Sequence, residues 1–133
     1  MEYLDEQLDF ERLIGRSSGD VEDDGVVAAN APLNATPTKK MDTSGSTVVY
    51  FTATWCGPCK RIAPRVAQLV AQNPQIRWLK VDVDRNSYTA TYCNVRTIPS
   101  FIAIRDTKIL GQTQLSDGDK IAEWVGQIFQ KTV

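Results

Sequence analysis

The chain has 133 residues, of which 42% are hydrophobic, and its formal net charge is −1. This length is enough for one compact domain with a core and too short for two domains of ordinary size. The first 26 residues hold nine acidic and two basic side chains, whereas the rest of the chain holds seven acidic and thirteen basic ones. Neither part has the density of Lys and Arg that nucleic-acid binding needs, and no apolar stretch approaches the length of a membrane span. We therefore expect neither a nucleic-acid partner nor a membrane partner.

The N-terminal region has the composition of an appendage. Residues 1–40 are dominated by acidic and small polar side chains, Gly and Pro, which predicts a mobile extension ahead of a domain at residues 41–133. A helix over residues 2–14 would place three apolar side chains roughly on one face, namely Leu4, Leu8 and Ile14. Docking of this helix on the domain, docking on a partner and fraying in solution are all compatible with the pattern.

Strand-like and helix-like patterns alternate along the rest of the chain. Runs of β-branched and aromatic residues predict strands, and apolar residues that recur every three or four positions predict helices. In chain order, the predicted elements are a strand at 47–53, a helix at 59–72, a strand at 76–83, a short helix at 87–93, a hairpin of strands at 100–104 and 108–114, and a closing helix that includes 121–129. Ser116 and Asp119 resemble a capping box before that closing helix. This order predicts an α/β sandwich in which helices flank a mixed central sheet.

The three cysteines include a single C-x-x-C motif, Cys56 and Cys59. The first residues lack the basic start and apolar run of a secretory signal, and their acidity is atypical of an organellar presequence. A lone C-x-x-C pair in a reducing compartment is usually catalytic or metal-binding rather than structural. We therefore expect a cytoplasmic protein.

Cys56 falls where the first predicted strand turns into the first predicted helix. Unpaired backbone N–H groups and the positive end of the helix dipole favour a thiolate at this position. Cys59 lies within the first helical turn, close enough to attack a mixed disulfide on Cys56. Gly57 lets a substrate backbone approach, and Pro58 lacks only an N–H that would be unpaired at a helix start. The pattern indicates a dithiol/disulfide oxidoreductase.

Metal binding and coincidence are the alternatives. Zinc generally takes four ligands, and the chain offers one C-x-x-C pair, a distant Cys93 and no histidine. An iron–sulfur cluster shared across a dimer could use one pair from each subunit. Two core cysteines without a function would require the adjacent Trp, the Gly-Pro dipeptide and the strand-to-helix position to be coincidental. Redox chemistry explains more of the sequence, and we expect no metal site.

The segment from Trp55 to Lys60, WCGPCK, matches the active-site hexapeptide of the thioredoxin family, and the resemblance extends from Thr47 to Phe129. The segment 81–84 resembles the end of the family's central strand, and the segment 98–100 resembles its cis-proline loop. The resemblance implies a thioredoxin-like three-layer sandwich with a redox-active disulfide.

The resemblance also implies roles for individual residues. Cys56 would be the nucleophile and Cys59 the resolving thiol. Trp55, Ile98 and Pro99 would contact an extended substrate, with Ile98 offering backbone hydrogen bonds and Pro99 in a cis peptide bond across from the cysteines. The Gly-Pro dipeptide resembles that of the reducing members, so protein-disulfide reduction is the implied activity.

The implied partners are disulfide-containing client proteins and a thioredoxin reductase, which would supply electrons from NADPH to a monomer without a bound cofactor. The competing hypothesis is a binding module that keeps the fold and acts mainly as a partner subunit. The intact Cys56 and Cys59 pair favours the enzyme.

Tyr50 is the main departure from the family. It stands six residues before the first cysteine, where the family usually buries an aspartate that helps to deprotonate the second cysteine. Lys80 matches the lysine usually found beside that aspartate. We therefore expect Tyr50 and Lys80 to support the cysteine pair, with Tyr50 slowing resolution.

Other departures concern turns, packing and the start of the fold. Thr107 replaces a glycine usual in the last hairpin turn, and Thr113 or Gln114 replaces one before the final helix. The family's first strand and helix are not evident before Thr47, so they are either reworked within residues 1–46 or missing. Three further side chains are assigned to packing: Trp78, Trp124 and Cys93, for which a disulfide between molecules is the minority hypothesis.

Overall fold

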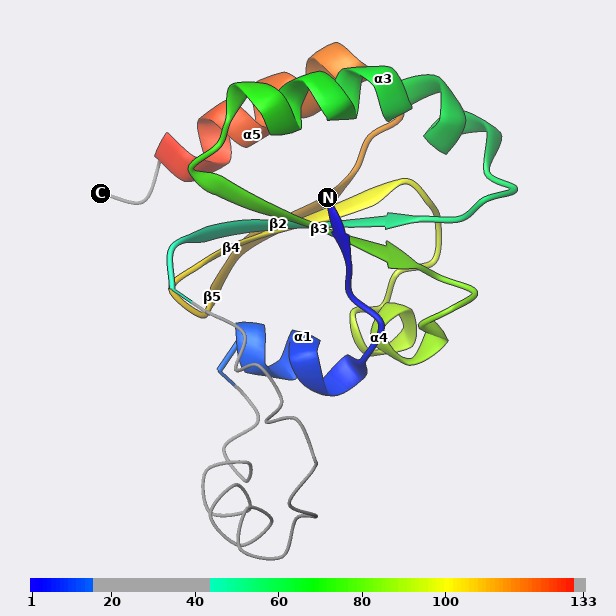
Figure 1. The fold of residues 1–133 in the computed structure, drawn as a ribbon, viewed down its shortest axis with the longest axis vertical. Coiled ribbons are helices and arrows are strands. Elements are labelled where there is room, and N and C mark those ends of the chain that lie inside the picture. Colours follow the sequence, from blue (N-terminus) through cyan, green and yellow to red (C-terminus); the bar gives the residue numbers. More distant parts are fainter. Residues whose placement is uncertain (16–43, 131–133) are drawn as a thin grey trace, which may run out of the picture.

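The computed structural model describes residues 1–15 and 44–130. Its elements are β1 (Glu2–Tyr3), α1 (Gln7–Leu13), β2 (Ser46–Thr52), α3 (Gly57–Gln72), β3 (Ile76–Asp82), α4 (Ser87–Tyr92), β4 (Ser100–Arg105), β5 (Lys108–Gln114) and α5 (Gly118–Gln130). The strands form one sheet in the order β1-β3-β2-β4-β5. β1, β3 and β2 run parallel, and β4 and β5 are antiparallel to their neighbours. Helices α3 and α5 cover one face of this mixed sheet and α1 and α4 cover the other, which gives the expected three layers (Figure 1).

The central strand β2 explains why its sequence is continuously apolar. Val48 and Tyr50 pack in the cluster under α3 and α5, whereas Val49 and Phe51 pack in the cluster against α1 and α4. A strand that is covered on both faces needs apolar side chains at every position rather than at alternate ones. The same arrangement holds the end of β2, and therefore the start of α3, in a rigid setting.

The N-terminal segment differs from the expected extension. β1 pairs in parallel with β3 through Glu2 and Tyr3, and α1 packs on the sheet. The side chains that enter the core are Leu4, Phe10 and Leu13, each no more than 2% exposed. Leu8, which was expected on the docking face, is 47% exposed.

The first 13 residues therefore belong to the domain. The predicted domain start at residue 41 leaves them out and is wrong in this respect. They form a short strand and a short helix, β1 and α1, ahead of β2, where the family's first strand and helix were not evident from the sequence. The predicted mobility of residues 16–40 lies outside the described residues.

The β4–β5 turn contacts the chain on both sides of the segment that is not described. Asp106 donates its backbone N–H to the Gly45 carbonyl (2.9 Å) and accepts the Gly45 N–H on its carboxylate (2.8 Å). A Cβ atom at Gly15 would stand 3.3 Å from the Cβ of Thr107. Asp106 and Thr107 both have positive φ, 48° and 70°, at the turn where the family usually has glycine.

The residue that caps the N-terminus of the closing helix, α5, is one position later in the chain than expected. The Asp117 carboxylate, rather than Ser116, accepts the N–H groups of Asp119 (2.9 Å) and Lys120 (3.2 Å). Asp is as good an N-cap as Ser, so the sequence signal is displaced without being lost. No helix within residues 1–15 and 44–130 is long and apolar enough to cross a bilayer.

Candidate active site

The cysteine pair lies where β2 passes into α3. The Cys56 N–H donates to the Ala53 carbonyl (3.2 Å), which closes the turn after the strand. Cys56 is the N-cap of α3, and its Sγ accepts the backbone N–H of Cys59 at 3.2 Å. Pro58 follows in the first turn, where its missing N–H leaves no donor unpaired. The sequence therefore places the Cys56 sulfur at the positive end of the helix.

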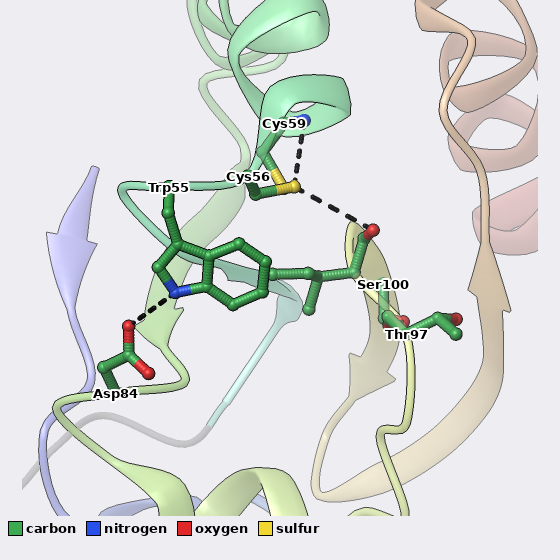
Figure 2. Close-up of a disulfide and its surroundings, with 7 residues drawn as sticks. Trp55, Cys56, Cys59, Asp84, Thr97 and Ser100 are labelled. Atoms are coloured by element: carbon green, nitrogen blue, oxygen red, sulfur yellow. Dashed lines mark hydrogen bonds between the residues drawn. A yellow bond between two sulfur atoms is a disulfide. The ribbon is translucent and has the colours of Figure 1, made fainter.

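Cys56 and Cys59 form a disulfide, with their Cα atoms 5.3 Å apart (Figure 2). The two residues are almost equally buried, at 2% and 3% exposure, and pack with Ala53, Val83 and Ile98. In this oxidised state, solvent exposure therefore does not distinguish the two cysteines. Their positions differ, because only Cys56 caps the helix and faces the loop before β4.

That loop carries the cis peptide bond, between Ile98 and Pro99, that the resemblance implies. The carbonyl oxygen of Ile98 lies 3.9 Å from the Cys56 sulfur (Figure 2). Ser100 donates its hydroxyl to the Thr97 carbonyl at 2.6 Å and closes the loop from its other end. Pro99 and Ser100 are buried, so this loop is a fixed wall beside the sulfur.

Trp55 forms the other wall of the site. Its indole is 65% exposed, and its Nε1 donates to the Asp84 carboxylate at 2.8 Å (Figure 2). Asp84 lies two residues beyond the end of β3, so the strand that runs parallel to β2 positions the partner of the residue beside the nucleophile. Sequence reasoning singled out Trp55 and missed Asp84 as its partner. The one signal in the sequence is the position of Asp84 at the end of the segment that resembles the family's central strand.

Tyr50 and Lys80 are neighbours across β2 and β3, as their positions in the family imply. Tyr50 is buried, and its ring stacks on Phe101 with centroids 4.9 Å apart and planes at 6°. Burial raises the pKa of the Tyr50 hydroxyl, and a side-chain hydrogen bond with Thr52 opposes this only partly. The Lys80 ammonium lies 5.0 Å from the ring centroid of Tyr3 on β1.

The structure therefore divides the predicted site residues into two groups. Around the sulfur atoms it brings together the residues of the hexapeptide and of the cis-proline loop: Trp55, Cys56, Gly57, Pro58, Cys59, Ile98 and Pro99. Tyr50 lies further back in the sheet as a core aromatic, and Lys80 points toward β1.

Cys93 lies away from this site, at the C-terminal end of α4. It is partly buried against the cluster under α1 and α4, and burial raises its pKa to about 12. This agrees with a packing role. Among residues 1–15 and 44–130, no group of three or more His, Cys, Asp or Glu side chains could hold a metal ion.

Comparison with known proteins gives the same family as the hexapeptide. The family model described as thioredoxin matches residues 33–127. A thioredoxin H-type from Ricinus communis is 37% identical over 89 residues, which cover 67% of this chain and 75% of that protein. Thioredoxin Asp f 28 from Aspergillus fumigatus is 41% identical over 81 residues, which cover 61% of this chain and 72% of that protein.

Solved structures agree on the architecture. The thioredoxin of Fasciola hepatica superposes with a TM-score of 0.64 and 28% identity, covering 96% of this chain and 98% of that one. Mitochondrial thioredoxin 3 from Saccharomyces cerevisiae, in its oxidised form, gives a TM-score of 0.69 over 95% of this chain and 93% of that one. At 23% identity, this second likeness concerns the fold alone.

Proposed function

The chain belongs to the thioredoxin family and is a thiol-disulfide oxidoreductase, and on this premise we propose that Cys56 attacks protein disulfides while Cys59 resolves the product. The position of Cys56 carries this assignment. Its sulfur accepts the Cys59 N–H at the N-terminus of α3, where a negative charge is stabilised by backbone donors and by the helix dipole. Cys59 is within the helix and has no equivalent donor at its sulfur among the described contacts.

The reaction exchanges two electrons in two steps. The Cys56 thiolate attacks one sulfur of the client disulfide, forms a mixed disulfide and releases the other client sulfur as a thiolate, which takes up a proton. Cys59 then loses its proton and attacks the Cys56 sulfur. The second client thiol leaves, and the Cys56–Cys59 disulfide that the structure contains is formed.

The walls of the site suit an extended client segment. The loop around the cis bond presents the Ile98 carbonyl oxygen beside the Cys56 sulfur, and Trp55 offers an exposed aromatic face on the other side. We propose that the client strand lies between them, with its cysteine over Cys56. Pro99 has no backbone N–H, so it places no hydrogen-bond donor where the client strand comes closest to the loop.

The source of electrons and the partners follow from the family. Two electrons must return to the Cys56–Cys59 disulfide after each turnover, and we propose NADPH through a thioredoxin reductase as their source. The other partners are client proteins that contain disulfides, and the chain acts as a monomer. A cytoplasmic location fits a lone C-x-x-C pair, which is typical of reducing compartments.

The test is reduction of a model protein disulfide with NADPH and a thioredoxin reductase. Each molecule of the wild-type chain should reduce many molecules of the model disulfide, and Cys56→Ser should be inactive. Cys59→Ser should accumulate a mixed disulfide through Cys56 that is visible by mass spectrometry. Cys93→Ser is the matched control and should behave as wild type. Trapping through Cys59 in the Cys56→Ser variant would reverse the assigned roles.

A further inference from the structure

Arg61 lies on the rim of the loop that carries the reactive sulfur. Its side chain is exposed, and its Nη1 lies 4.0 Å from the place where a Cβ at Gly57 would stand. Gly57 lies between the two cysteines, so the guanidinium is beside the backbone that a client must approach. Lys60, also exposed, adds a second positive charge next to it.

These two cations are not neutralised within the part of the chain that the structure describes. No carboxylate there lies within ion-pair distance of Lys60 or Arg61, and the first turn of α3 contains no acidic residue. Arg65, about one turn further along α3, does have a partner, because its Nε lies 3.5 Å from the Asp119 carboxylate. The charge is therefore left free only at the end of α3 that carries the cysteines.

Two carboxylates lie on the opposite side of the site, beside Trp55 and β1. Asp5 pairs with Arg85 at 2.8 Å, whereas Asp84 accepts only the neutral Trp55 indole N–H and keeps its negative charge on that side. On the loop that faces Cys56, Arg96 adds a further exposed positive charge two residues before Ile98, and its Nε bonds only the neutral amide of Asn94. We call these three exposed cations the cationic rim: Lys60 and Arg61, which follow Cys59 on α3, and Arg96, on the loop that faces Cys56. The positive end of the α3 dipole adds to their charge.

We propose that this cationic rim selects client disulfides flanked by Asp or Glu, with Arg61 as the main determinant. The proposal rests on the proposed function, because it concerns which disulfides the Cys56 thiolate attacks. Charges of opposite sign on two surfaces speed their encounter and fix their register, and salt screens this effect. Clients with Lys or Arg beside the disulfide would meet repulsion at the same place.

The experiment uses the pre-reduced full chain and three matched peptide disulfides that differ only in having Glu, Gln or Lys beside the cystine. The rate constant for oxidation of the protein by each peptide is measured without any reductase. At low ionic strength the Glu peptide should react about tenfold faster than the Lys peptide, and at about 0.5 M salt the ratio should fall to roughly twofold or less.

Variants then assign the effect to the rim. Arg61→Gln should lower the ratio of the rate constants for the Glu and Lys peptides by about threefold, and Arg61→Glu should bring this ratio to one or below. Lys108→Glu makes a comparable charge change on β5, at the far end of the sheet from Cys56, and should leave the ratio unchanged.

Three results would overturn the proposal: equal rates for the Glu and Lys peptides with the wild-type chain at low salt, an unchanged ratio in Arg61→Glu, or an equal fall for all three peptides in Arg61→Gln. The last result would mean that the guanidinium acts on the Cys56 thiolate rather than on the client. Failure of the proposed function looks different, because the reduced chain would then leave even the Gln peptide intact.

Discussion

The indole Nε1 of Trp55 donates a 2.8 Å hydrogen bond to the carboxylate of Asp84, so a residue of the loop after β3 orients the aromatic wall beside Cys56. The indole is otherwise 65% exposed and has little else to hold it. A charge-assisted hydrogen bond of this kind fixes an orientation that a free indole would hold only part of the time.

Asp84→Ala should therefore lower kcat/KM for a protein disulfide by about three- to tenfold while costing roughly 1 kcal/mol or less of stability. Asp84→Asn retains an acceptor oxygen and should lose less. The measurement is disulfide reduction under saturating electron donor, with urea unfolding as the stability readout. Activity of Asp84→Ala equal to that of wild type would show that the bond does not position Trp55 for the reaction.

Thr107 occupies a left-handed backbone conformation, with φ of 70°, that is unfavourable for a β-branched residue. Thr107→Gly and Thr107→Asn should each raise the free energy of unfolding by about 1 kcal/mol, because both residues adopt positive φ more readily. Thr113→Gly on the following strand is the control and should destabilise the protein. Loss of stability in both Thr107 variants would contradict this account of the turn.

The N-terminal residues are predicted to be indispensable, in contrast to what composition indicates. A chain that starts at Thr38 lacks Leu4, Phe10 and Leu13, which are at most 2% exposed. Removing each such side chain typically costs about 2–5 kcal/mol, and a domain of this size has about 5–15 kcal/mol in total. Circular dichroism and thermal unfolding should show that this chain is unfolded or strongly destabilised.

A matched deletion separates the two parts of the N-terminal region. Gly15 and Gly45 both contact the β4–β5 turn, so a short Gly-Ser linker can replace residues 17–43 without moving either end. This chain should fold and reduce disulfides at the wild-type rate. If it fails to fold while the chain from Thr38 folds, the assignment of residues 1–13 to the domain core is wrong.

Cys93 should be nearly inert at neutral pH. Burial raises its pKa to about 12, so its thiolate is scarce, and its alkylation rate should rise about tenfold for each pH unit. In the fully reduced protein at pH 7, iodoacetamide should label Cys56 at least about 100-fold faster than Cys93. Mass spectrometry of the modified peptides gives both rates, and unfolding in denaturant should make the three cysteines react alike. Rapid labelling of Cys93 in the folded chain would restore the hypothesis of a disulfide between molecules.

The sequence predicted the features that depend on local patterns. β2 to β5 and α3 to α5 lie within a few residues of their predicted ranges, because strong apolar patterns mark them. The hexapeptide identified both cysteines. The N-terminal elements were harder to predict, because β1 has two residues and α1 has seven. Segments this short do not allow a periodic apolar pattern to be distinguished from coincidence. The Trp55–Asp84 bond joins residues 29 positions apart, so only the tertiary structure shows it.

Tyr50 is predicted to slow resolution of the mixed disulfide without affecting the attack by Cys56. Cys59 is 3% exposed and must lose its proton before it can attack, and desolvation raises the pKa of a buried thiol. The pKa of the Tyr50 hydroxyl is itself raised by burial, so near neutrality it holds its own proton and is a poor base. An aspartate at this position could accept the proton directly or through water.

Tyr50→Asp should therefore speed resolution near pH 7 and shift its pH profile to lower values. It should also cost about 3 kcal/mol or more, because it removes the stack on Phe101 and buries a carboxyl group. Tyr50→Phe keeps the stack and removes only the hydroxyl, so its resolution rate should equal that of wild type even if the Asp variant is too unstable to study. The measurement is single-turnover decay of the Cys56 mixed disulfide from pH 6 to 9. Slower decay in Tyr50→Phe would identify the hydroxyl as a participant, and coincident curves for folded Tyr50→Asp and wild type would exclude residue 50 from the proton transfer.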